Sequence, residues 1–465
     1  MELFKTRSII VFYRTALILS LIIFSQSLCL PAGLGRDEII EKYSPVAERI
    51  IAALKGDSTA WKRTAYICDH FGARLSGSKA LEEMLDWGFQ KMKADGLERV
   101  AKEPVMVPHW DRGNEYLEMV SPRKMRLPVS VLGGSINTPN GPITAPCYVV
   151  GGIEDLERNP APAKGKIVVF NIKFENYAQA IKYRYHGAVI AARFGAVASL
   201  TRSATPAEIY QPHSGSMGYV DSLPKIPHGA ITPEDAAMLG RLQADGENIV
   251  LSFYTESKFL PDSPSSNLLG EITGSEFPGE VIAVGGHSDS WDNTRGAHDD
   301  ASGCVAGWQI VKVLRDLGLR PKRTIRAVFW ANEENGNRGG IEYARAHLGE
   351  KHIYACEFDG GIFAPYSINF SGPDSLMERK LKPLEGILSK YFGSIQINKG
   401  GGGVDIGPLM RNNGVPGLSP GWDTSGKYFW YHHSPNDTPE KINSDDFNNQ
   451  VAVMALALYI LANEY

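Results

Sequence analysis

Three continuous runs of apolar residues in the C-terminal half of the chain have the composition of buried strands. They are VIAV at 281–284, TIRAVFW at 324–330 and IYACEF at 353–358. Unbroken apolar runs of this length are typical of strands buried on both faces of an α/β sheet. Between the first two runs, apolar residues recur at the spacing of one helix face, namely Val305, Trp308, Val311 and Leu314. The order strand, loop, helix, strand therefore predicts an α/β domain.

Helical patterns also lie near both ends of the chain. Segments 37–54 and 82–96 carry apolar residues at helical spacing, and we expect both to pack on the α/β sheet. Near the C-terminus, the run VAVMALALYILA at 451–462 predicts a core helix that is too short to span a membrane. These elements extend the predicted α/β domain to both sides of the middle segment.

The middle of the chain has a different texture. Short β-like runs are separated there by Gly and Pro, namely LPVSVLGG, APCYVVGG, GKIVVFN, AVASLTR and NIVLSFY. We therefore predict a smaller β-rich domain at 126–262, inserted into a larger domain formed by 36–125 and 263–465. The segment PDSPSSN at 261–267 reads as the linker back to the larger domain.

The N-terminus has the pattern of an export signal. Lys5, Arg7 and Arg14 precede the apolar run ALILSLIIF at 16–24, and small residues follow it. We predict a signal peptide at 1–32, a possible pro-segment that extends to about 45, and a secreted or periplasmic location. The apolar run is shorter than the about 20 residues that span a bilayer. An uncleaved anchor that begins at Ile9 is the alternative, but the mature chain is expected to have no membrane span.

Composition narrows the functional classes. The chain has 48 basic and 52 acidic side chains and a formal net charge of −4, which argues against a nucleic-acid partner. Its 43% hydrophobic content allows a large core. The mature chain would keep four cysteines, Cys68, Cys147, Cys304 and Cys356, which are too few for a disulfide scaffold. We expect buried thiols, and a Cys68–Cys147 bridge stays open.

The loop after the first apolar run concentrates residue types that bind metals. The segment GGHSDSWDNTRGAHDD at 285–300 holds His287, Asp289, Asp299 and Asp300. Neutral imidazole and carboxylate suit a borderline divalent ion such as Zn²⁺. In the His-x-Asp pair, Asp289 is expected to orient the imidazole of its neighbour.

Further candidates follow the other apolar runs. Glu333 and Glu334 follow the second run, Asp359 follows the third, and His433 lies near the C-terminus. Ligand sites of α/β sheets gather outside the carboxyl ends of the strands, so we expect these side chains to converge. The acidic pair at 299–300 could instead only cap the following helix, but capping does not explain the other candidates. A set of five ligands predicts a site for two metal ions.

The order of these motifs identifies a resemblance. The motifs H-x-D, G-A-x-D-D-x-x-G, E-E, Asp and H-x-x-x-D follow one another as in co-catalytic zinc aminopeptidase-like enzymes, and the chain resembles peptidase family M28. Similar segments cover nearly the whole mature chain, among them RLSGSKALE, EPVMVPHWDRG, KIPHGAITPEDA and DLGLRPKRTIR. The resemblance implies a three-layer α/β/α domain with a mixed sheet, a protease-associated-like insert and a homodimer.

The resemblance also implies roles for the candidate residues, with two Zn²⁺ per chain as cofactors. The implied set is His287 and Asp359 on one ion, Glu334 and His433 on the other, and Asp299 bridging both. Glu333 is left as the general base, which takes a proton from the metal-bridging water and passes it to the leaving amine. His433 is preferred over His432 because the family motif places an acid, here Asp437, four residues after the ligand. His298 is expected to have a packing role.

The substrate pocket is less sharply defined by the sequence. A glycine-rich segment, KGGGGVDIGP at 399–408, resembles a family loop that contacts substrate, although a flexible loop reads equally well. Asp405 could recognise a free α-amino group, or could cap a following helix. Ser425 and Tyr428 lie on the segment that leads to His433 and are candidates to line the pocket.

These observations predict an exported di-zinc peptidase that hydrolyses small unblocked peptides, in particular dipeptides. The same ligand set would serve an aminopeptidase acting on longer chains or a deacylase acting on N-acyl amino acids. A non-catalytic binding ectodomain on the same fold is the alternative from another class, and the complete set of ligands and base argues against it.

Overall fold

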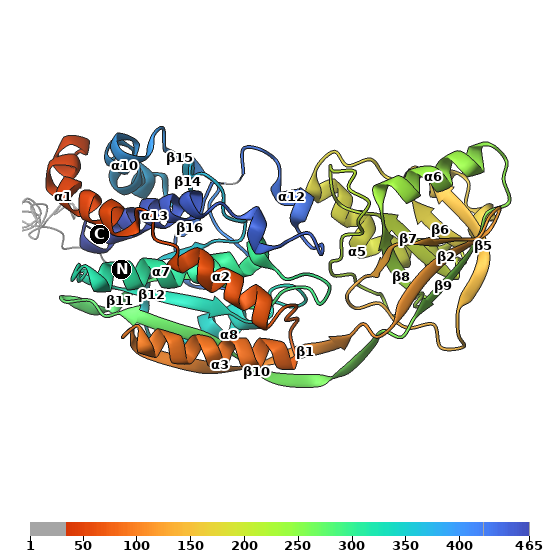
Figure 1. Ribbon diagram of the computed structural model, residues 1–465, viewed down its shortest axis with the longest axis horizontal. Helices are drawn as coiled ribbons and strands as arrows, with labels where there is room; N and C mark the ends of the chain where they lie inside the picture. The colour runs from red at the N-terminus through yellow and green to blue at the C-terminus, as the bar shows by residue number, and fades with distance from the viewer. Residues whose placement is uncertain (1–33, 422, 465) are drawn as a thin grey trace, which may run out of the picture.

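The protein has two units that lie side by side along its long axis, each built on its own sheet. A computed structural model describes residues 34–421 and 423–464, so the predicted signal peptide at 1–32 lies outside the described residues. Figure 1 shows the long strands β1 (Glu98–Asp111) and β10 (Lys258–Ile272) running from one unit toward the other. They pair antiparallel along most of their length. The chain thus enters and leaves the second unit on neighbouring strands.

The first unit contains a mixed sheet, in agreement with the predicted fold class. Its order is β1-β10-β12-β11-β13-β16-β14-β15. The strands not yet bounded are β11 (Phe277–His287), β12 (Arg323–Trp330), β13 (Lys351–Glu357), β14 (Ser367–Ser371), β15 (Gln396–Lys399) and β16 (Gly417–Pro420). The three predicted apolar runs form β11, β12 and β13, which are parallel neighbours at the centre. Ile282 lies opposite Ile325 on one side and Tyr354 on the other.

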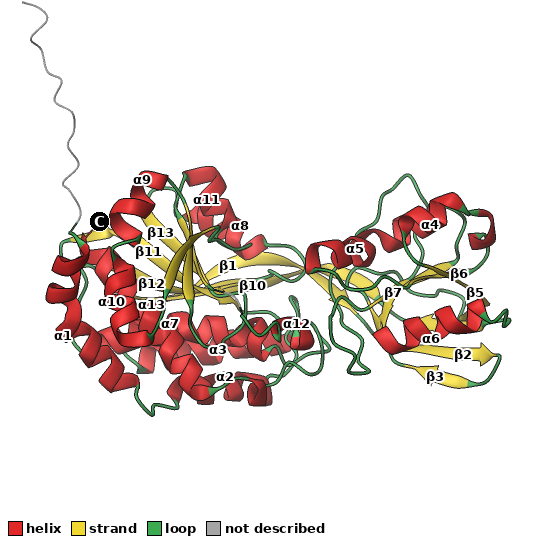
Figure 2. Ribbon diagram, turned by 90° about the horizontal axis from the view of Figure 1, so that it is seen from above, coloured by secondary structure: helices red, strands yellow, loops and turns green. Residues whose placement is uncertain are grey.

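Helices cover both faces of this sheet and produce three layers (Figure 2). One face packs against helices α3 (Lys79–Ala94), α7 (Ser302–Asp316), α10 (Leu384–Phe392) and α13 (Ser444–Glu464). Helices α1 (Arg36–Leu54) and α2 (Thr59–His70) pack on these helices and not directly on the sheet, where 37–54 was expected to pack. The other face packs against α8 (Arg338–Ala346) and α11 (Gly407–Asn413). Ile282 and Val284 point into the first core and Ala283 into the second, as the two-residue period of a strand requires. Short helices complete the unit, namely η2 (Ala297–Ala301), α9 (Asp374–Leu376), η3 (Met377–Leu381), α12 (Tyr428–Tyr431) and η4 (Pro439–Lys441).

The second unit is a smaller α/β layer structure, and the predicted short runs are its strands. The order is β3-β2-β9-β5-β6-β7-β8-β4. The strands are β2 (Glu115–Ser121), β3 (Met125–Leu127), β4 (Val129–Val131), β5 (Ile143–Val150), β6 (Ile167–Phe170), β7 (Ala198–Arg202), β8 (His228–Ile231) and β9 (Val250–Thr255). The helices are α4 (Ile153–Arg158), η1 (Ala161–Ala163), α5 (Tyr177–Arg193) and α6 (Pro233–Ala244). Helices α5 and α6 pack on opposite faces of this sheet.

The predicted linker at 261–267 is wrong, because these residues belong to strand β10. Ser265 and Asn267 pair with Val105 and Glu103 of β1, so pairing with a neighbouring strand overrides the loop-like Pro and Ser composition. The second sheet also begins at Glu115, before the predicted start of the insert at 126, because β2 pairs with β9. The chain therefore passes from one sheet to the other on paired strands and not through a flexible linker.

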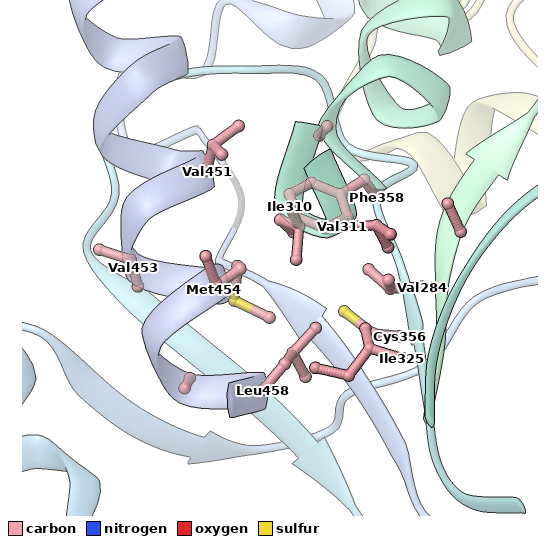
Figure 3. Packing of buried hydrophobic residues seen from close by; sticks show 14 of the residues in the cluster. Val284, Ile310, Val311, Ile325, Cys356, Phe358, Val451, Val453, Met454 and Leu458 are labelled. Carbon is pink, nitrogen blue, oxygen red and sulfur yellow. The ribbon is translucent and has the colours of Figure 1, made fainter. Parts of the chain in front are cut away.

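The C-terminal run forms the core helix that the sequence predicts. Figure 3 shows Val451, Met454 and Leu458 of α13 facing Ile310 of α7 and Ile325 of the sheet. In the described part of the chain, no helix is long and apolar enough to cross a membrane. The four cysteines of the described residues are buried free thiols, so the Cys68–Cys147 bridge does not form.

We expect Leu458→Ala to destabilise the first unit. Leu458 is fully buried, so its truncation removes apolar contacts and leaves a cavity, at a cost of about 2–5 kcal/mol in the free energy of unfolding. Equilibrium urea unfolding would measure this cost. Leu348→Ala is the matched control, because Leu348 is 67% exposed. Equal unfolding midpoints for the two variants would contradict the packing described for α13.

Candidate metal centre and the cavity beside it

The predicted ligands converge at the carboxyl ends of the central strands. His287 is the last residue of β11, Glu333 and Glu334 lie in the turn after β12, and Asp359 lies just after β13. Asp299 belongs to η2, immediately before α7. Parallel strands bring their carboxyl ends to one edge of the sheet, which explains why residues far apart in the sequence meet there. His433, which follows α12, completes the group.

Asp299 lies between two histidines. Its Oδ1 is 3.1 Å from Nε2 of His287, and its Oδ2 is 3.3 Å from Nε2 of His433. Each histidine faces a second acid as well. The His287 ring lies 3.6 Å from Oδ1 of Asp359, and the His433 ring lies 3.0 Å from Oε2 of Glu334. The structure thus gathers the five predicted ligands as two acid–histidine pairs with one shared carboxylate.

The rival histidines have different surroundings. His432 stacks on His433, and its Nε2 is 3.6 Å from Oδ2 of Asp299, whereas in the described chain the ion pair with Glu334 is formed by His433. His298 stacks against Phe363, and its Nδ1 accepts a hydrogen bond from the backbone of Ile362 at 3.1 Å. This geometry agrees with the packing role expected for His298.

Two further carboxylates position the ligands through backbone groups. The side chain of Asp289 accepts hydrogen bonds from the backbone N–H groups of Glu333 (3.1 Å) and Glu334 (3.4 Å). His287 Nδ1 is closer to the main-chain carbonyl of Asp289, at 3.0 Å, than to its carboxylate, at 3.8 Å. Asp289 therefore orients the histidine through its backbone and the glutamates through its side chain. Asp437 similarly accepts from the backbone of Asp299 at 3.1 Å.

A buried arginine holds the loop that carries these residues. Arg74 is fully enclosed and donates to the carbonyl oxygens of Ser288 (2.8 Å), Arg295 (2.6 Å) and Gly296 (2.9 Å). These contacts join the start and the end of the loop at 285–300, which carries His287 and Asp299. The predicted motif therefore depends on a residue more than 200 positions earlier in the chain.

Burial and mutual repulsion shift the acids of this cluster. Burial raises the pKa of Glu333 and of Glu334 well above the usual range, and the negative charge of Asp299 raises both further. Burial also opposes ionisation of Asp299, but contact with His287 and the nearby imidazoles hold its pKa below the usual range. Burial lowers the pKa of His433 well below its usual value, and so favours the neutral imidazole that binds metals.

The donor set fits divalent cations. Oδ2 of Asp299 and Oε1 of Glu334 are buried without a hydrogen-bond partner, although buried carboxylate oxygens are normally satisfied. Within residues 34–421 and 423–464, the ion pairs of Asp299, Glu334 and Asp359 are formed with histidines alone. Donor atoms of His287, Asp299 and Glu334 lie within 4.8 Å of one another. Imidazole nitrogen and carboxylate oxygen are the ligands that Zn²⁺ takes in catalytic sites.

The cluster forms one wall of a cavity of ≈ 580 Å³. Both units line it. The first unit contributes acids and aromatic groups, and the second contributes Gly133, Tyr177, Arg184 and Met217. Tyr177 stacks on Phe429 with the ring centroids 4.8 Å apart, and Figure 1 shows helix α5 beside α12 at this junction. The insert therefore shapes the cleft, as the sequence allowed.

The three predicted pocket residues separate in the structure. Tyr428 lines the cavity, and Asp405 and Ser425 are not among its lining residues. Asp405 is a fully buried residue of the glycine-rich segment and makes no capping contact with α11. Ser425 is exposed, and its backbone N–H binds Asp423 in a local turn at 2.7 Å. Among these residues, Tyr428 is thus the one that the structure places at the cavity.

Other residues at the site carry no signal in the sequence. Ser214 of the second unit contacts His433 twice, because its N–H donates to the His433 carbonyl (2.8 Å) and its own carbonyl lies 3.2 Å from Nδ1. These contacts hold His433 at φ = 58°, a conformation uncommon for a residue with a side chain. Glu357 anchors the glycine-rich loop by accepting from Val404 at 2.9 Å, and a side chain at Gly403 would collide with it.

Comparison with known proteins agrees with this geometry. Residues 267–458 match the model described as Peptidase family M28. The chain is 41% identical over 434 residues to carboxypeptidase Q from Bos taurus, which covers 92% of this chain and 90% of that protein. The chain belongs to peptidase family M28. This M28 chain is also 40% identical over 414 residues to carboxypeptidase Q from Homo sapiens, with 88% and 86% covered.

Solved structures support the same fold for this M28 chain. A Peptidase M28 precursor from Shewanella amazonensis SB2B superposes with a TM-score of 0.86 at 33% identity, and covers 91% of this chain and 97% of that chain. The zinc aminopeptidase BSAP from Bacillus subtilis superposes with a TM-score of 0.64 at 20% identity, with 86% and 94% covered. At this low identity, the likeness to BSAP shows a shared fold.

We expect Asp437→Ala to weaken metal binding. The carboxylate of Asp437 accepts from the backbone of His298 (2.8 Å) and Asp299 (3.1 Å), so its loss frees the segment that carries the shared acid. Loss of such an outer contact typically lowers metal affinity by about 10–100-fold. Competition with a chelator would measure the affinity for Zn²⁺. Asp445→Ala is the control because Asp445 is an exposed acid in the first turn of α13. An unchanged affinity in Asp437→Ala would refute the positioning role.

Proposed function

We propose that this chain is an exported metallopeptidase that uses two Zn²⁺ per chain to hydrolyse small unblocked peptides, in particular dipeptides. The observation that carries the proposal is the position of Asp299, whose two carboxylate oxygens face two histidines, each of which faces an acid of its own. One shared acid and two separate pairs supply ligands for a pair of ions. His287 with Asp359 would hold one ion, and His433 with Glu334 would hold the other.

Glu333 is the group suited to move protons at this site. It lines the cavity next to Glu334, and its backbone is fixed by Asp289, while it belongs to neither acid–histidine pair. Bound zinc would polarise the scissile carbonyl and lower the pKa of water. Glu333 then accepts a proton from the attacking water as the new C–O bond forms. It returns that proton to the nitrogen as the C–N bond breaks, which releases an acid and an amine.

The size and the walls of the cavity support a small substrate. Its volume of ≈ 580 Å³ is in the range of small-ligand pockets, and the second unit covers it opposite the acids. The relatives at about 40% identity carry the name carboxypeptidase, which also supports cleavage at a peptide end. These observations favour a dipeptidase over an aminopeptidase acting on long chains or a deacylase.

Export is part of the proposal and rests on the N-terminal sequence pattern. A cut near residue 45 would remove Ile39 and Tyr43, which are buried in the core of the first unit. We therefore propose that the mature protein retains helix α1. The homodimer that the resemblance implies stays a prediction.

Purified mature protein should contain close to two zinc ions per chain, because the ligands form two pairs around Asp299. Elemental mass spectrometry would give the number. Hydrolysis of leucylalanine should stop after chelation and return when zinc is added. No turnover of any peptide by zinc-loaded protein would refute the proposed function.

Glu333→Gln should keep the metal and lose most of the activity. Glutamine has nearly the same shape but cannot accept the proton, so we expect kcat to fall by about 10²–10⁴-fold. Glu342→Gln is the matched control, since Glu342 lies on the surface of α8 in an ion pair with Arg345. Turnover of leucylalanine and zinc content should be measured together. Near-normal kcat in Glu333→Gln with bound zinc would exclude Glu333 as the base.

A further inference from the structure

Arg184 of helix α5 points a buried cation at the cavity. The residue is 9% exposed and lines the same cavity as Glu333, Glu334 and His433. One of its terminal nitrogens donates to the hydroxyl of Tyr177 at 2.9 Å and lies 3.3 Å from Nδ1 of His433. Its Nε is enclosed and has no hydrogen-bond partner. The guanidinium therefore retains unused donor capacity beside the metal centre.

Within the described parts of the chain, no carboxylate forms an ion pair with Arg184, in contrast to Arg112 of the same region, which pairs with Asp292 at 2.6 Å. Among the residues that line the cavity in the described chain, no other is lysine or arginine. Burying an unpaired charge is costly, and an anionic ligand would remove that cost. The position thus favours an anion in the cavity.

The fold makes room for the guanidinium at this point. A side chain at Gly215 would come within 2.5 Å of three guanidinium atoms, and Gly215 has φ = 142°. Tyr177 adds a favourable contact, because the guanidinium carbon lies 5.4 Å from the centre of its ring. Arg184 is therefore held in place by packing while its charge faces the cavity.

The distance from the metal centre defines the part of the substrate that Arg184 can reach. Arg184 contacts His433, and one residue of a peptide spans about 3.3–3.6 Å. A group bound to the guanidinium therefore lies about one residue from the reacting bond. A substrate with one residue after the scissile bond has its terminal α-carboxylate at this distance. A longer chain, or an amidated one, has a neutral amide there.

We propose that Arg184 binds the free α-carboxylate of the substrate and so restricts hydrolysis to peptides with a single residue after the scissile bond. The inference rests on the proposed function and names its specificity residue. Guanidinium and carboxylate match as planar, bidentate partners, which gives both strength and orientation. Arg184 also belongs to the second unit, so the insert selects the substrate while the first unit performs the chemistry.

An alternative role for Arg184 is to hold His433 in place. Nδ1 of His433 already faces the carbonyl of Ser214 at 3.2 Å, and a histidine that binds metal through Nε2 carries its proton on Nδ1 and donates there. His433 then needs no donor from Arg184. A positioning role would affect all substrates equally, whereas carboxylate binding affects only those with a free C-terminus.

The test compares leucylalanine with leucylalanine amide. In the zinc-loaded wild-type enzyme, kcat/KM should be at least about 30-fold higher for the free acid, the effect expected for a buried charged pair. Arg184→Met should lower kcat/KM for the acid by a similar factor and leave the amide within about threefold. Arg184→Lys keeps the charge without the planar guanidinium, so its kcat/KM for the acid should lie between those of the wild-type enzyme and Arg184→Met. Arg202→Met is the matched control, since Arg202 lies in the same unit away from this cavity and contacts Glu208.

Each outcome decides one point. Equal rates on acid and amide in the wild-type enzyme would overturn the inference while leaving the peptidase intact, and this comparison requires no variant. Equal losses on both substrates in Arg184→Met, with zinc retained, would assign Arg184 to positioning. Hydrolysis of neither substrate by the zinc-loaded wild-type enzyme would overturn the proposed function itself. If Arg184→Met does not fold, Arg184→Lys and the wild-type comparison still decide.

Discussion

The gathering of several carboxylates in a buried site is the constraint on which the rest of this structure depends. Asp299, Glu333, Glu334 and Asp359 repel one another where little water screens them. The fold holds these acids in place through the main chain, because the backbone N–H groups of Glu333 and Asp299 donate to the carboxylates of Asp289 and Asp437. The ligand positions are therefore set by main-chain geometry at the ends of strands, which is stiffer than a loop. Bound zinc would offset part of this negative charge.

The two units divide the work at this site. The first unit supplies the acids and histidines from the carboxyl ends of its parallel strands. The second unit supplies the opposite wall and the main chain of Ser214, which fixes the conformation of His433. Neither unit alone would form the complete cavity. This arrangement explains why a peptidase of this size carries an insert that contributes no metal ligand.

The sequence was sufficient for the features that depend on local pattern. Apolar runs predicted β11, β12 and β13, and because parallel strands end at one edge, the positions of His287, Glu334 and Asp359 followed. The prediction of a linker was wrong because the Ser and Pro residues of 261–267 form a strand only when paired with β1. The sequence could not show that Asp405 and Ser425 lie outside the cavity, since whether a side chain faces the cavity depends on how both units fold. Arg184 gave no signal, because an isolated arginine on an amphipathic helix usually faces solvent.

The grip of Ser214 on His433 uses only a backbone N–H and a backbone carbonyl. Any residue other than proline supplies both groups, so substitutions at Ser214 leave this grip in place as long as the path of the chain is kept. The insert also enters and leaves on adjacent paired strands, so changes to its side chains leave the first sheet in place. Evolution can therefore remodel the substrate wall through this insert while the catalytic chemistry is inherited unchanged.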